Sequence, residues 1–519
     1  GFAMTNGEHA YPIAGLTLES VQNCRIFNNN VSSNGYYGVK LNSCSKNIVE
    51  NNIGANNWYG LLIQNSDDNI IANNSFSTNY WSGIWIHYSR NNTLRNNTLI
   101  QDGIHFTGDL LEYWNTHDID TSNTVSGKPV HYWKNKMNGN VPSDAGQVIL
   151  ANCTNVTVEN QNLSGGSAGI ELGFSYENTI NNNSISSNDK GILLYKSRNN
   201  KINDSLLSSN YQGIYFWYSD YNSVTNSTIS SSGCYGIYLS YLGSNIIHAN
   251  NVISNNVYGF YIMGSKYNLI YHNNIISNFQ QAFANSPNYW NASYPLGGNY
   301  WSDHSGVDNY KGPLQNIPGW DGIGDNAYTK IDGGKEDNYP LMEPYKPNSN
   351  MTNLKKGWNL ISMPLIQQEQ NLTRVLGSID GWYDAVRVYD SNDTNDPWKQ
   401  TKIDKPFGND LSELNETMGF WIHITQPGNT IFLYNGTQPT SNQTIPFHPG
   451  WNLVGYPSLT SYNRTEGLNN LTFGSEVDAI WTFNVATKMW KEIGGGDYFE
   501  VGRGYWIHAN IECEWEVPL

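Results

Sequence analysis

The sequence predicts an all-β chain in which a right-handed parallel β-helix of about 10–11 coils precedes an irregular cap and two small β-sandwich or barrel-like modules. Three observations support this prediction. A short unit recurs every 22 or 23 residues over the first 280 positions, a segment rich in Gly, Pro and aromatic residues follows, and a different duplication fills the remainder. We expect the β-helix at residues 1–290, the cap at 291–348, and the modules at 349–445 and 446–519.

The recurring unit has the form Asn-x-Ile-x-x-Asn-x-Ile, with Leu or Phe at some of the Ile positions. It begins at Asn69, Asn92, Asn178 and Asn268. The period is too short for two helices, and apolar residues two positions apart are typical of a strand. Each unit also carries a Gly followed by alternating apolar residues. One unit therefore forms one coil of two or three short strands joined by Asn, Ser and Gly turns.

Stacked coils place equivalent residues about 4.8 Å apart, so the repeat predicts columns of like side chains. An apolar column is expected inside, made of Ile26, Val49, Ile71, Leu94, Val158, Ile180, Ile202, Val224, Ile247 and Ile270. A neighbouring column is expected to form a ladder, because an Asn amide can bond both the backbone and the amide of the next coil. Its asparagines are Asn29, Asn52, Asn74, Asn97, Asn183, Asn250 and Asn273. We interpret them as structural rather than as a ligand site.

Residues 103–146 interrupt the cadence and hold the densest cluster of titratable groups in the first half of the chain. A loop that interrupts a regular scaffold is a common place for function. The cluster consists of His105, Asp109, Glu112, His117, Asp118, Asp120 and His131. Its spacing matches no metal motif, so we expect an insertion that covers one face of the β-helix, and keep a metal or catalytic site as the alternative.

The segment after the last coil is aromatic and irregular, as expected of a cap that protects the open strand edges. Its Asp-Gly-Ile-Gly-Asp loop, from Asp321 to Asp325, supplies carboxylates, the ligands that hard cations prefer. Two acids are too few for tight binding, so Asp303, Asp308 or Asp332 would have to complete the shell. The loop predicts a calcium site, with a glycine-supported turn as the alternative.

Beyond a linker, Gly357-Trp358-Asn359-Leu360 recurs 93 residues later from Gly450. Further matches lie at Asp384 and Asp478, at Trp398 and Trp490, and in the Trp-Ile-His segments that contain His423 and His508. These short alternating strands predict two small all-β modules. Their repeated tryptophans fit either sugar stacking or core packing, and we expect core packing. The repeated histidines are expected to share a structural role.

Composition indicates an exported protein. The net charge of −16 argues against nucleic acid and anionic membrane as partners, and no stretch of 18 apolar residues is present. The five cysteines show no metal spacing, and a disulfide between Cys24 and Cys44 stays open. We expect further residues upstream of Gly1. Asn-x-Ser/Thr sites for N-linked sugar are expected at Asn73, Asn91, Asn96, Asn155, Asn226, Asn371, Asn392, Asn415, Asn435, Asn442, Asn463, Asn470 and Asn484.

The Asn-x-Ile-x-x-Asn-x-Ile coils resemble the NosD-type β-helix repeats, which are also grouped as carbohydrate-binding and sugar-hydrolase domains. The segments from Gly298 to Asp303 and from Asp337 to Met342 resemble the end of such domains in archaeal surface proteins, and the Gly-Trp-Asn-Leu modules are similar to C-terminal domains of archaeal S-layer-like proteins. Ile317 and Gly319 stand where the calcium loop of those proteins has acids. The resemblance implies the fold, which hosts binding, enzymatic and structural proteins alike. The copper role of NosD is not carried over, because the sequence shows no Cys/Met/His copper arrangement.

Three functions are compatible with these features. The first is a glycosylated cell-surface structural protein of an envelope, sheath or filament, whose partners are copies of itself or other surface proteins. The second is a polysaccharide lyase or hydrolase on the β-helix flank, but Glu171, Asp189, Asp204 and Asp220 share no equivalent positions on adjacent coils, so no catalytic residue is assigned. The third is glycan binding or adhesion through aromatics near the turns, namely Trp58, Tyr59, Trp81, Trp217 and Tyr218. We favour the first, combined with the third.

Overall fold

The computed structural model describes residues 14–345, 350–367, 369–403, 405, 408–434, 436–485 and 487–519. The chain forms two compact units. One holds the described residues up to Val307 together with Gly324–Tyr345, and the other holds Asp308–Ile323 and the described residues beyond 345. The predicted cap segment is therefore divided between the two units.

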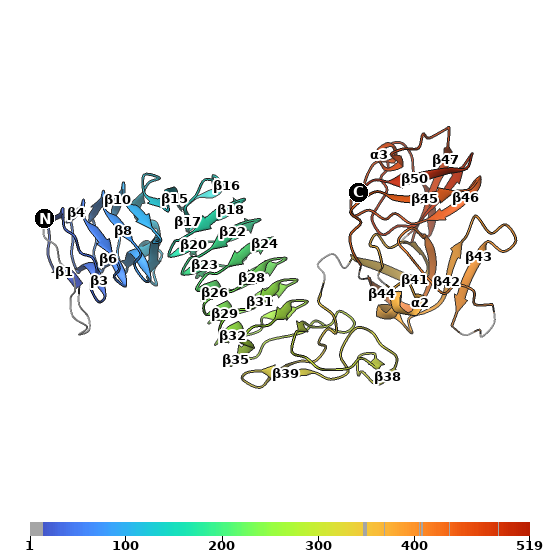
Figure 1. The fold of residues 1–519 in the computed structure, drawn as a ribbon, viewed down its shortest axis with the longest axis horizontal. Coiled ribbons are helices and arrows are strands. Elements are labelled where there is room, and N and C mark those ends of the chain that lie inside the picture. The colour runs from blue at the N-terminus through green and yellow to red at the C-terminus, as the bar shows by residue number, and fades with distance from the viewer. Residues whose placement is uncertain are drawn as a thin grey trace. The chain divides into compact units, whose positions relative to one another are not determined.

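The first unit is a right-handed parallel β-solenoid of about 13 coils, more than the 10–11 predicted. Figure 1 shows two runs of stacked strands, one blue to cyan and one teal to green. The first run has two five-stranded sheets. One contains β1 (Ala14–Glu19), β3 (Tyr37–Asn42), β6 (Tyr59–Gln64), β9 (Ser82–His87) and β12 (Ile104–Thr107). The other contains β2 (Arg25–Phe27), β4 (Ile48–Glu50), β7 (Ile70–Ala72), β10 (Thr93–Arg95) and β13 (Asp118–Ile119).

A third sheet of 12 strands passes through both runs. Its strands are β5 (Ile53–Ala55), β8 (Ser75–Ser77), β11 (Thr98–Ile100), β14 (Thr124–Val125), β15 (Lys128–Lys134), β17 (Gln147–Ala151), β20 (Ala168–Gly173), β23 (Lys190–Tyr195), β26 (Gln212–Trp217), β29 (Tyr235–Ser240), β32 (Tyr258–Met263) and β35 (Gln280–Ala284). The strands β14 and β15 pair antiparallel, whereas the other pairs of this sheet are parallel. At this pair the last face of the first run becomes the first face of the second run.

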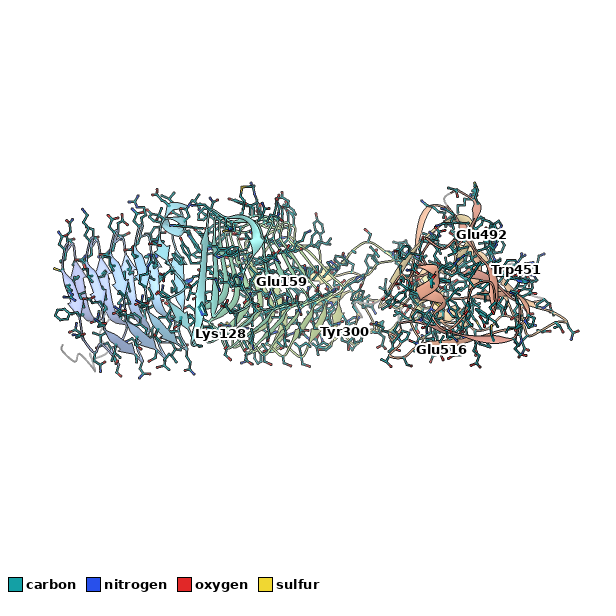
Figure 2. All side chains as sticks on the ribbon, turned by 90° about the horizontal axis from the view of Figure 1, so that it is seen from above. Lys128, Glu159, Tyr300, Trp451, Glu492 and Glu516 are labelled. Atoms are coloured by element: carbon teal, nitrogen blue, oxygen red, sulfur yellow. The ribbon has the colours of Figure 1, made fainter. Side chains whose placement is uncertain are left out.

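Two seven-stranded sheets complete the second run. One contains β16 (Met137–Asn140), β18 (Thr154–Glu159), β21 (Thr179–Asn181), β24 (Lys201–Asn203), β27 (Ser223–Thr225), β30 (Ile246–His248) and β33 (Leu269–Tyr271). The other contains β19 (Asn162–Ser164), β22 (Ser184–Ser186), β25 (Leu206–Ser208), β28 (Thr228–Ser230), β31 (Asn251–Ile253), β34 (Asn274–Ile276) and β36 (Tyr300–Trp301). Figure 2 shows the side chains along the coils, with Lys128 of β15, Glu159 of β18 and Tyr300 of β36 labelled.

The predicted inner column is present. Ile26, Val49 and Ile71 are register partners on successive strands, and the column continues from Val158 to Ile270 in the second run. From Val49 onward these side chains have no exposed surface. A buried aliphatic side chain contributes roughly 1.5–3 kcal/mol, so the column is a major source of stability.

The amide ladder is also present. The side-chain oxygen of Asn74 accepts the backbone N–H and the Nδ2–H of Asn52, both at 3.0 Å, and Asn97 does the same for Asn74. In addition, Asn74 Nδ2 donates to the Val49 carbonyl at 2.8 Å. The pattern repeats at Asn29, Asn250 and Asn273, while Asn183 donates its N–H to Ser205. These buried amides thus find partners on the neighbouring coils, and Asn52, Asn250 and Asn273 also donate to a carbonyl of their own coil.

The predicted insertion at 103–146 supplies β12 to β16, so it continues the coils instead of leaving them, which explains the larger coil number. Its helix α1 (Glu112–Asn115) covers the outer face of the second run. Trp114 is buried there and stacks on Tyr195, with ring centroids 5.3 Å apart. It lies over Gly173, where a Cβ atom would come within 2.1 Å of the indole. The expected role of this segment as a cover is therefore seen at α1.

Irregular chain closes the solenoid. In the first unit, β39 (Tyr328–Ile331) and β40 (Lys335–Asp337) form a hairpin near β35. In the second unit, β37 (Tyr310–Lys311) pairs with β38 (Ile317–Pro318), and Lys311 forms an ion pair with Asp380. Residues 308–323 thus belong with the modules, to which Trp320 also attaches by packing under Arg374.

The second unit contains two similar modules. The first has a four-stranded sheet in the order β41 (Asn350–Ile361), β44 (Phe420–Tyr434), β42 (Tyr383–Tyr389) and β43 (Trp398–Lys402), with α2 (Leu372–Val375) and the 3₁₀ turn η1 (Gly377–Ile379). The second has β46 (Gly450–Val454), β49 (Tyr505–Ala509), β47 (Val477–Asn484) and β48 (Met489–Glu492) in the same order, with α3 (Arg464–Leu468). Because β45 (Gln443–Phe447) pairs with β50 (Cys513–Val517), the second module begins at β45.

The two modules contact each other reciprocally. Ile361 of the first module forms an isolated antiparallel β-bridge with Arg503 of the second, and Met418 of the first forms another with Val454 of the second. Ile361 and Val454 are equivalent in the duplication, and so are Met418 and Arg503. The duplicated modules therefore form a pair with approximate twofold symmetry inside one chain.

Candidate functional site

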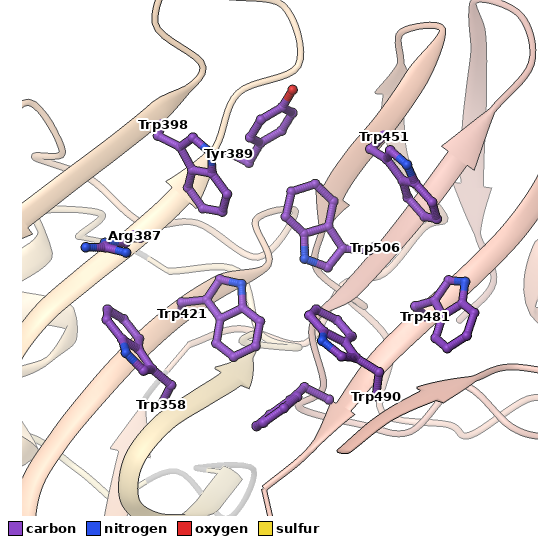
Figure 3. Close-up of a pocket in the computed structure, with 10 residues that line it drawn as sticks. Trp358, Arg387, Tyr389, Trp398, Trp421, Trp451, Trp481, Trp490 and Trp506 are labelled. Atoms are coloured by element: carbon purple, nitrogen blue, oxygen red, sulfur yellow. The ribbon is translucent and has the colours of Figure 1, made fainter. Parts of the chain in front are cut away.

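A basin lined by aromatic side chains lies on the second unit, with a cavity volume of about 890 Å³. Figure 3 shows its lining, drawn from the sheets of both modules. The residues are Trp358, Arg387, Tyr389, Trp398, Trp421, Trp451, Trp481, Phe483, Trp490 and Trp506. We call this feature the tryptophan basin.

Strand alternation explains why these rings face outward. In β44, Phe420, Ile422 and Ile424 are buried, whereas Trp421 and His423 between them are half-buried. The aliphatic side chains already fill the interior, so the opposite face of the strand carries the aromatic ones. The same alternation holds in β49 around Trp506. The expectation that the repeated tryptophans form the module cores is therefore wrong.

The lining consists of five positions of the duplication, each used twice. Trp358 corresponds to Trp451, and Trp421 corresponds to Trp506. The three strand positions Arg387, Tyr389 and Trp398 correspond to Trp481, Phe483 and Trp490. One basin is thus built from two equivalent half-sites, and the signal for it in the sequence was the placement of every repeated aromatic on the same strand face.

Rings from each half-site pack against the other. Trp421 lies 5.2 Å from Phe483 and 5.6 Å from Trp490, and Trp506 lies 5.1 Å from Tyr389 and 5.8 Å from Trp398, measured between ring centroids. These central rings join the modules. Around them, the side chains of Trp398, Trp451 and Trp490 stay 42%, 42% and 48% exposed. The basin therefore keeps large flat surfaces that the described part of the chain leaves uncovered.

Each half-site also carries a polar pair beside its outer tryptophan. His423 Nδ1 lies 2.7 Å from Asp384 Oδ1, and its ring lies 5.0 Å from Trp358. In the second module, His508 Nδ1 lies 2.7 Å from Asp478 Oδ1, 5.1 Å from Trp451. The two histidines therefore have equivalent surroundings, and their shared structural role stays a prediction. Indole faces can stack on the C–H face of a sugar ring, and the partly exposed imidazoles and carboxylates can bond its hydroxyl groups.

The titratable residues of the segment 103–146 form separate pairs instead of one site. His105 lies 2.9 Å from the buried Glu171, His131 lies 2.8 Å from Asp144, and Glu112 lies 2.9 Å from Arg90. Asp118 and Asp120 both pair with Arg95, and the Asp109 carbonyl accepts from Lys196. The alternative of a metal or catalytic cluster in this segment gains no support from the geometry.

Two of the polar ladders of the first run end at this segment, one on His117 within it and one on Asp102 immediately before it. His117 Nδ1 accepts the N–H of Asn92 at 3.2 Å, and burial lowers the pKa of His117 to about 4, which keeps the ring neutral. Asp102 accepts two hydrogen bonds from Asn79, at 3.2 Å from the backbone and 2.7 Å from Nδ2. Burial raises the pKa of Asp102 to about 8. Both residues are final rungs, which need to accept from the coil below.

The ladder of the second run ends in the same way. Asn299 is its last amide, and Asp337 of β40 accepts the Asn299 N–H at 2.7 Å. The same carboxyl oxygen accepts the indole N–H of Trp301 at 2.9 Å. Asp337 has no exposed surface, and burial raises its pKa to about 7. The hairpin β39–β40 therefore acts as a polar cap on the amide ladder.

A second, polar groove of about 400 Å³ lies where turns of the two solenoid runs meet. Trp81 and Tyr211 contact each other across it, with ring centroids 5.7 Å apart. Its lining includes the carboxyl groups of Asp102 and Asp189, and Asp189 forms an ion pair with Lys190.

Three acids of the predicted calcium site, Asp303, Asp308 and Asp321, accept hydrogen bonds within turns or the cap. Asp321 accepts from the N–H groups of Gly312 and Ile323, and Asp308 accepts from those of Asp321 and Gly322. In the other unit, Asp303 accepts the Tyr328 hydroxyl at 3.0 Å, and the backbone N–H of Asp325 donates to Val307. Within the described residues, no group of three or more His, Cys, Asp or Glu is placed to hold a metal ion. Calcium binding stays a prediction.

The predicted glycosylation sites fall into three sets. Asn73, Asn91, Asn96, Asn155 and Asn226 are exposed and have positive φ angles, so the turns of the solenoid also explain their identity. Asn371, Asn392, Asn442 and Asn470 are exposed in the modules, while Asn415 and Asn463 are half-buried. Asn435 lies outside the described residues. Asn484 is followed by Val485 and Ala486 and so lacks the required Ser or Thr, which makes that assignment wrong.

Two further features bear on the compartment. All five cysteines are free, Cys24 at the surface and Cys44 buried. None of the helices in the described ranges has the length and apolar character needed to cross a membrane.

Comparison with known proteins supports the β-helix. Residues 129–306 match the family profile described as "Periplasmic copper-binding protein (NosD)", and residues 11–141 match the profile described as "Right handed beta helix region". No curated protein matches the chain. The copper binding in the first description finds no cluster of His, Cys, Asp or Glu among the residues that the structure describes.

Several solved structures are similar over part of their length. A double mutant of the periplasmic alginate epimerase AlgG is 11% identical with a TM-score of 0.26, over 51% of this chain and 75% of that chain. The Azotobacter vinelandii mannuronan C-5 epimerase AlgE6 A-module is 11% identical with a TM-score of 0.24, over 51% and 82%. The GH136 lacto-N-biosidase from Eubacterium ramulus is 11% identical with a TM-score of 0.22, over 56% and 60%. We draw no functional conclusion from similarity at this level.

Proposed function

We propose that this protein is a secreted, glycosylated cell-surface structural protein that binds glycans through the tryptophan basin. The observation that carries the proposal is the partial exposure of flat indole rings, three of them 42–48% exposed, in one basin built from two equivalent half-sites. An exposed apolar surface of this kind marks an interaction site. The His–Asp pairs beside Trp358 and Trp451 favour a ligand rich in hydroxyl groups over a proline-rich peptide, which would use the aromatic faces alone.

The solenoid would provide the structural part of this function. Each of its two runs has a core of stacked aliphatic side chains, and its buried amides are paired from coil to coil, so each run is a rigid element with few loops. The exposed sequons and the net charge of −16 fit an exported protein. Copies of the chain or other surface proteins are the proposed partners.

Glycan binding can be tested by calorimetric titration of the full chain with a panel of oligosaccharides and a proline-rich peptide. We expect at least one oligosaccharide to bind, and the variants Trp451→Ala and Trp490→Ala each to weaken binding about tenfold, since a stacked ring is worth about 1–3 kcal/mol. Tyr221→Ala is the matched control, because Tyr221 is 60% exposed but lies on the solenoid. Binding of the peptide alone, or equal loss in the control, would contradict the proposal.

The structural role needs a separate measurement. Multi-angle light scattering over a wide concentration range, with electron micrographs of the same samples, is expected to show ordered assemblies. Monomers at every concentration and no assemblies would contradict it, while leaving the glycan test unaffected.

The polar groove of the solenoid favours a second candidate function, a polysaccharide lyase or hydrolase. A buried carboxyl whose pKa is raised to about 8, Asp102, and the carboxylate of Asp189 line the same groove, and glycoside hydrolysis uses two carboxyl groups of different protonation state. Product release from acidic and neutral polysaccharides tests this candidate. Activity abolished by Asp189→Asn would establish it, and no product from any polysaccharide would exclude it.

A further inference from the structure

The two half-sites of the tryptophan basin differ in charge at one position. Four of the five equivalent pairs are aromatic in both modules, as in Trp358 and Trp451. At the fifth, the first module has Arg387 where the second has Trp481. Among the described residues of the lining, Arg387 is the one that carries a charge, so the basin has a cationic end and a neutral end.

The surroundings of Arg387 leave its charge uncompensated. Its guanidinium carbon lies 4.9 Å from the centre of the Trp358 ring, and its Nε atom is buried without a hydrogen-bond partner. No Asp or Glu in the described ranges lies within ion-pair distance of it. In a chain with a net charge of −16, carboxylates are plentiful, and one could have been placed there. A half-buried guanidinium held against an indole presents its N–H groups to a ligand, and such groups match a carboxylate or sulfate.

We propose that the tryptophan basin selects an acidic glycan, with an anionic sugar substituent on Arg387 and neighbouring sugar rings on the tryptophans of both modules. This inference rests on the proposed glycan binding and adds the class of glycan. The overall negative charge repels a polyanion at long range, so the selection acts at short range through Arg387. The asymmetry also sets the direction in which the glycan lies in the basin, because its acidic sugar occupies the end formed by the first module.

The experiment is a calorimetric titration of the full chain with an oligogalacturonide and with the same oligosaccharide after chemical reduction of its carboxyl groups. The expected result is an affinity for the acidic form about tenfold higher, which falls as salt is added. Arg387→Trp makes the first half-site resemble the second, and we expect it to lose this preference while it still binds the reduced form. Arg387→Gln is the second variant, in case the larger ring disturbs folding.

Two further arms sharpen the test. Trp481→Arg gives both half-sites a cation and is expected to raise the preference for the acidic form. A carboxylate and a sulfate ester can both pair with Arg387, so a sulfated galacto-oligosaccharide is titrated as well. The form with the higher affinity identifies which of the two anions the basin selects. Equal affinity of the unmodified protein for the acidic and reduced forms, or an unchanged preference in both Arg387 variants, would overturn the inference and leave glycan binding intact. No binding of any oligosaccharide would instead refute the proposed function.

Discussion

Side chains alternate between the two strand faces in both the solenoid and the paired modules, but the residue types that face inward and outward differ. In the solenoid, some of the most polar side chains are buried: Asn52, Asn74 and Asn97 lie inside, beside the aliphatic column. In the modules, several tryptophan side chains lie outside, on the strand face opposite the core. Each arrangement departs from the rule that polar residues face water and large apolar residues avoid it.

The two kinds of internal repeat explain the difference. Translation along the solenoid gives each buried amide an identical amide one coil away, so its donors and acceptors are satisfied without water. Approximate twofold symmetry between the modules gives each exposed ring a counterpart: Trp421 packs on the second module and Trp506 on the first. The kind of repeat thus determines which residue types can occupy the inner and outer strand faces. Where a ladder of amides ends, a different residue accepts from the last amide, as Asp102 and Asp337 do.

Breaking one rung of the ladder is expected to have the largest effect. Asn74→Ala removes the acceptor of two Asn52 groups and leaves the Val49 carbonyl without its donor. Asn52 Nδ2 keeps two other acceptors, so two groups lose their partner. Each buried orphan group costs about 1–3 kcal/mol, so the solenoid should lose on the order of 2–6 kcal/mol of unfolding free energy. The measurement is urea denaturation followed by far-ultraviolet circular dichroism.

The matched control is Asn181→Ala. Asn181 also lies on a solenoid strand, but it faces outward and accepts one bond of 3.4 Å from Asn203. A loss below about 0.5 kcal/mol is expected there, as for most surface substitutions. Similar losses in the two variants would show that the ladder is dispensable.

Removing a central ring of the basin should have the next largest effect. Trp421→Ala and Trp506→Ala each delete a half-buried ring that contacts two aromatic side chains of the other module. We expect each to lower the free energy of unfolding of the second unit by about 2–3 kcal/mol, somewhat less than for a fully buried tryptophan. The approximate symmetry predicts nearly equal losses, whereas a large difference between the two would mean that the modules are not equivalent partners.

The fold could be predicted from the sequence because its repeats fix the side-chain environment one coil at a time. The column from Ile26 to Ile270 and the ladder asparagines follow from a constant period, and each position repeats its own evidence. The join between the two runs could not be predicted, because β14–β15 is a single event with no second copy in the sequence. For the same reason the final rungs Asp102, His117 and Asp337 gave no recognisable signal.

The tryptophan basin was missed for a different reason. Its residues were identified as repeated, but their size led to their assignment to the core. The strand Phe420–Ile424 already contained the contrary evidence, because Trp421 shares its face with the polar His423 while the aliphatic residues share the other. The position of Arg387 two residues before Tyr389 pointed the same way. Alternation is therefore a better guide to facing than residue size in short strands.

The end of the ladder offers the most specific test of the translational argument. Burial raises the pKa of Asp102 from 3.8 to about 8, so the folded state holds a proton between these values that the unfolded state has released. The stability of the solenoid should therefore fall as pH rises from about 4 to about 8 and change no further from this group above about pH 8. Asp102→Asn keeps an acceptor for Asn79 and removes the titration. We expect the variant to unfold at a higher temperature than the unmodified protein at pH 9 and at a similar one at pH 5, in thermal scans at both pH values.

Asp337 serves as the internal comparison for this prediction. Its pKa is raised to about 7 by burial, so Asp337 adds a pH dependence of the same sign that persists in Asp102→Asn and disappears in the double variant with Asp337→Asn. His117, with its pKa lowered to about 4, destabilises the fold only as the pH falls below about 6.5, and it contributes equally to all these variants. If the pH dependence of the double variant equals that of the unmodified protein, the two carboxyl groups are not the buried ends of the ladders. A graded loss, first one step and then the other, would place a protonated acid at the end of each run, because only a carboxyl group that keeps its proton in the folded state above its ordinary pKa gives a pH dependence of this sign.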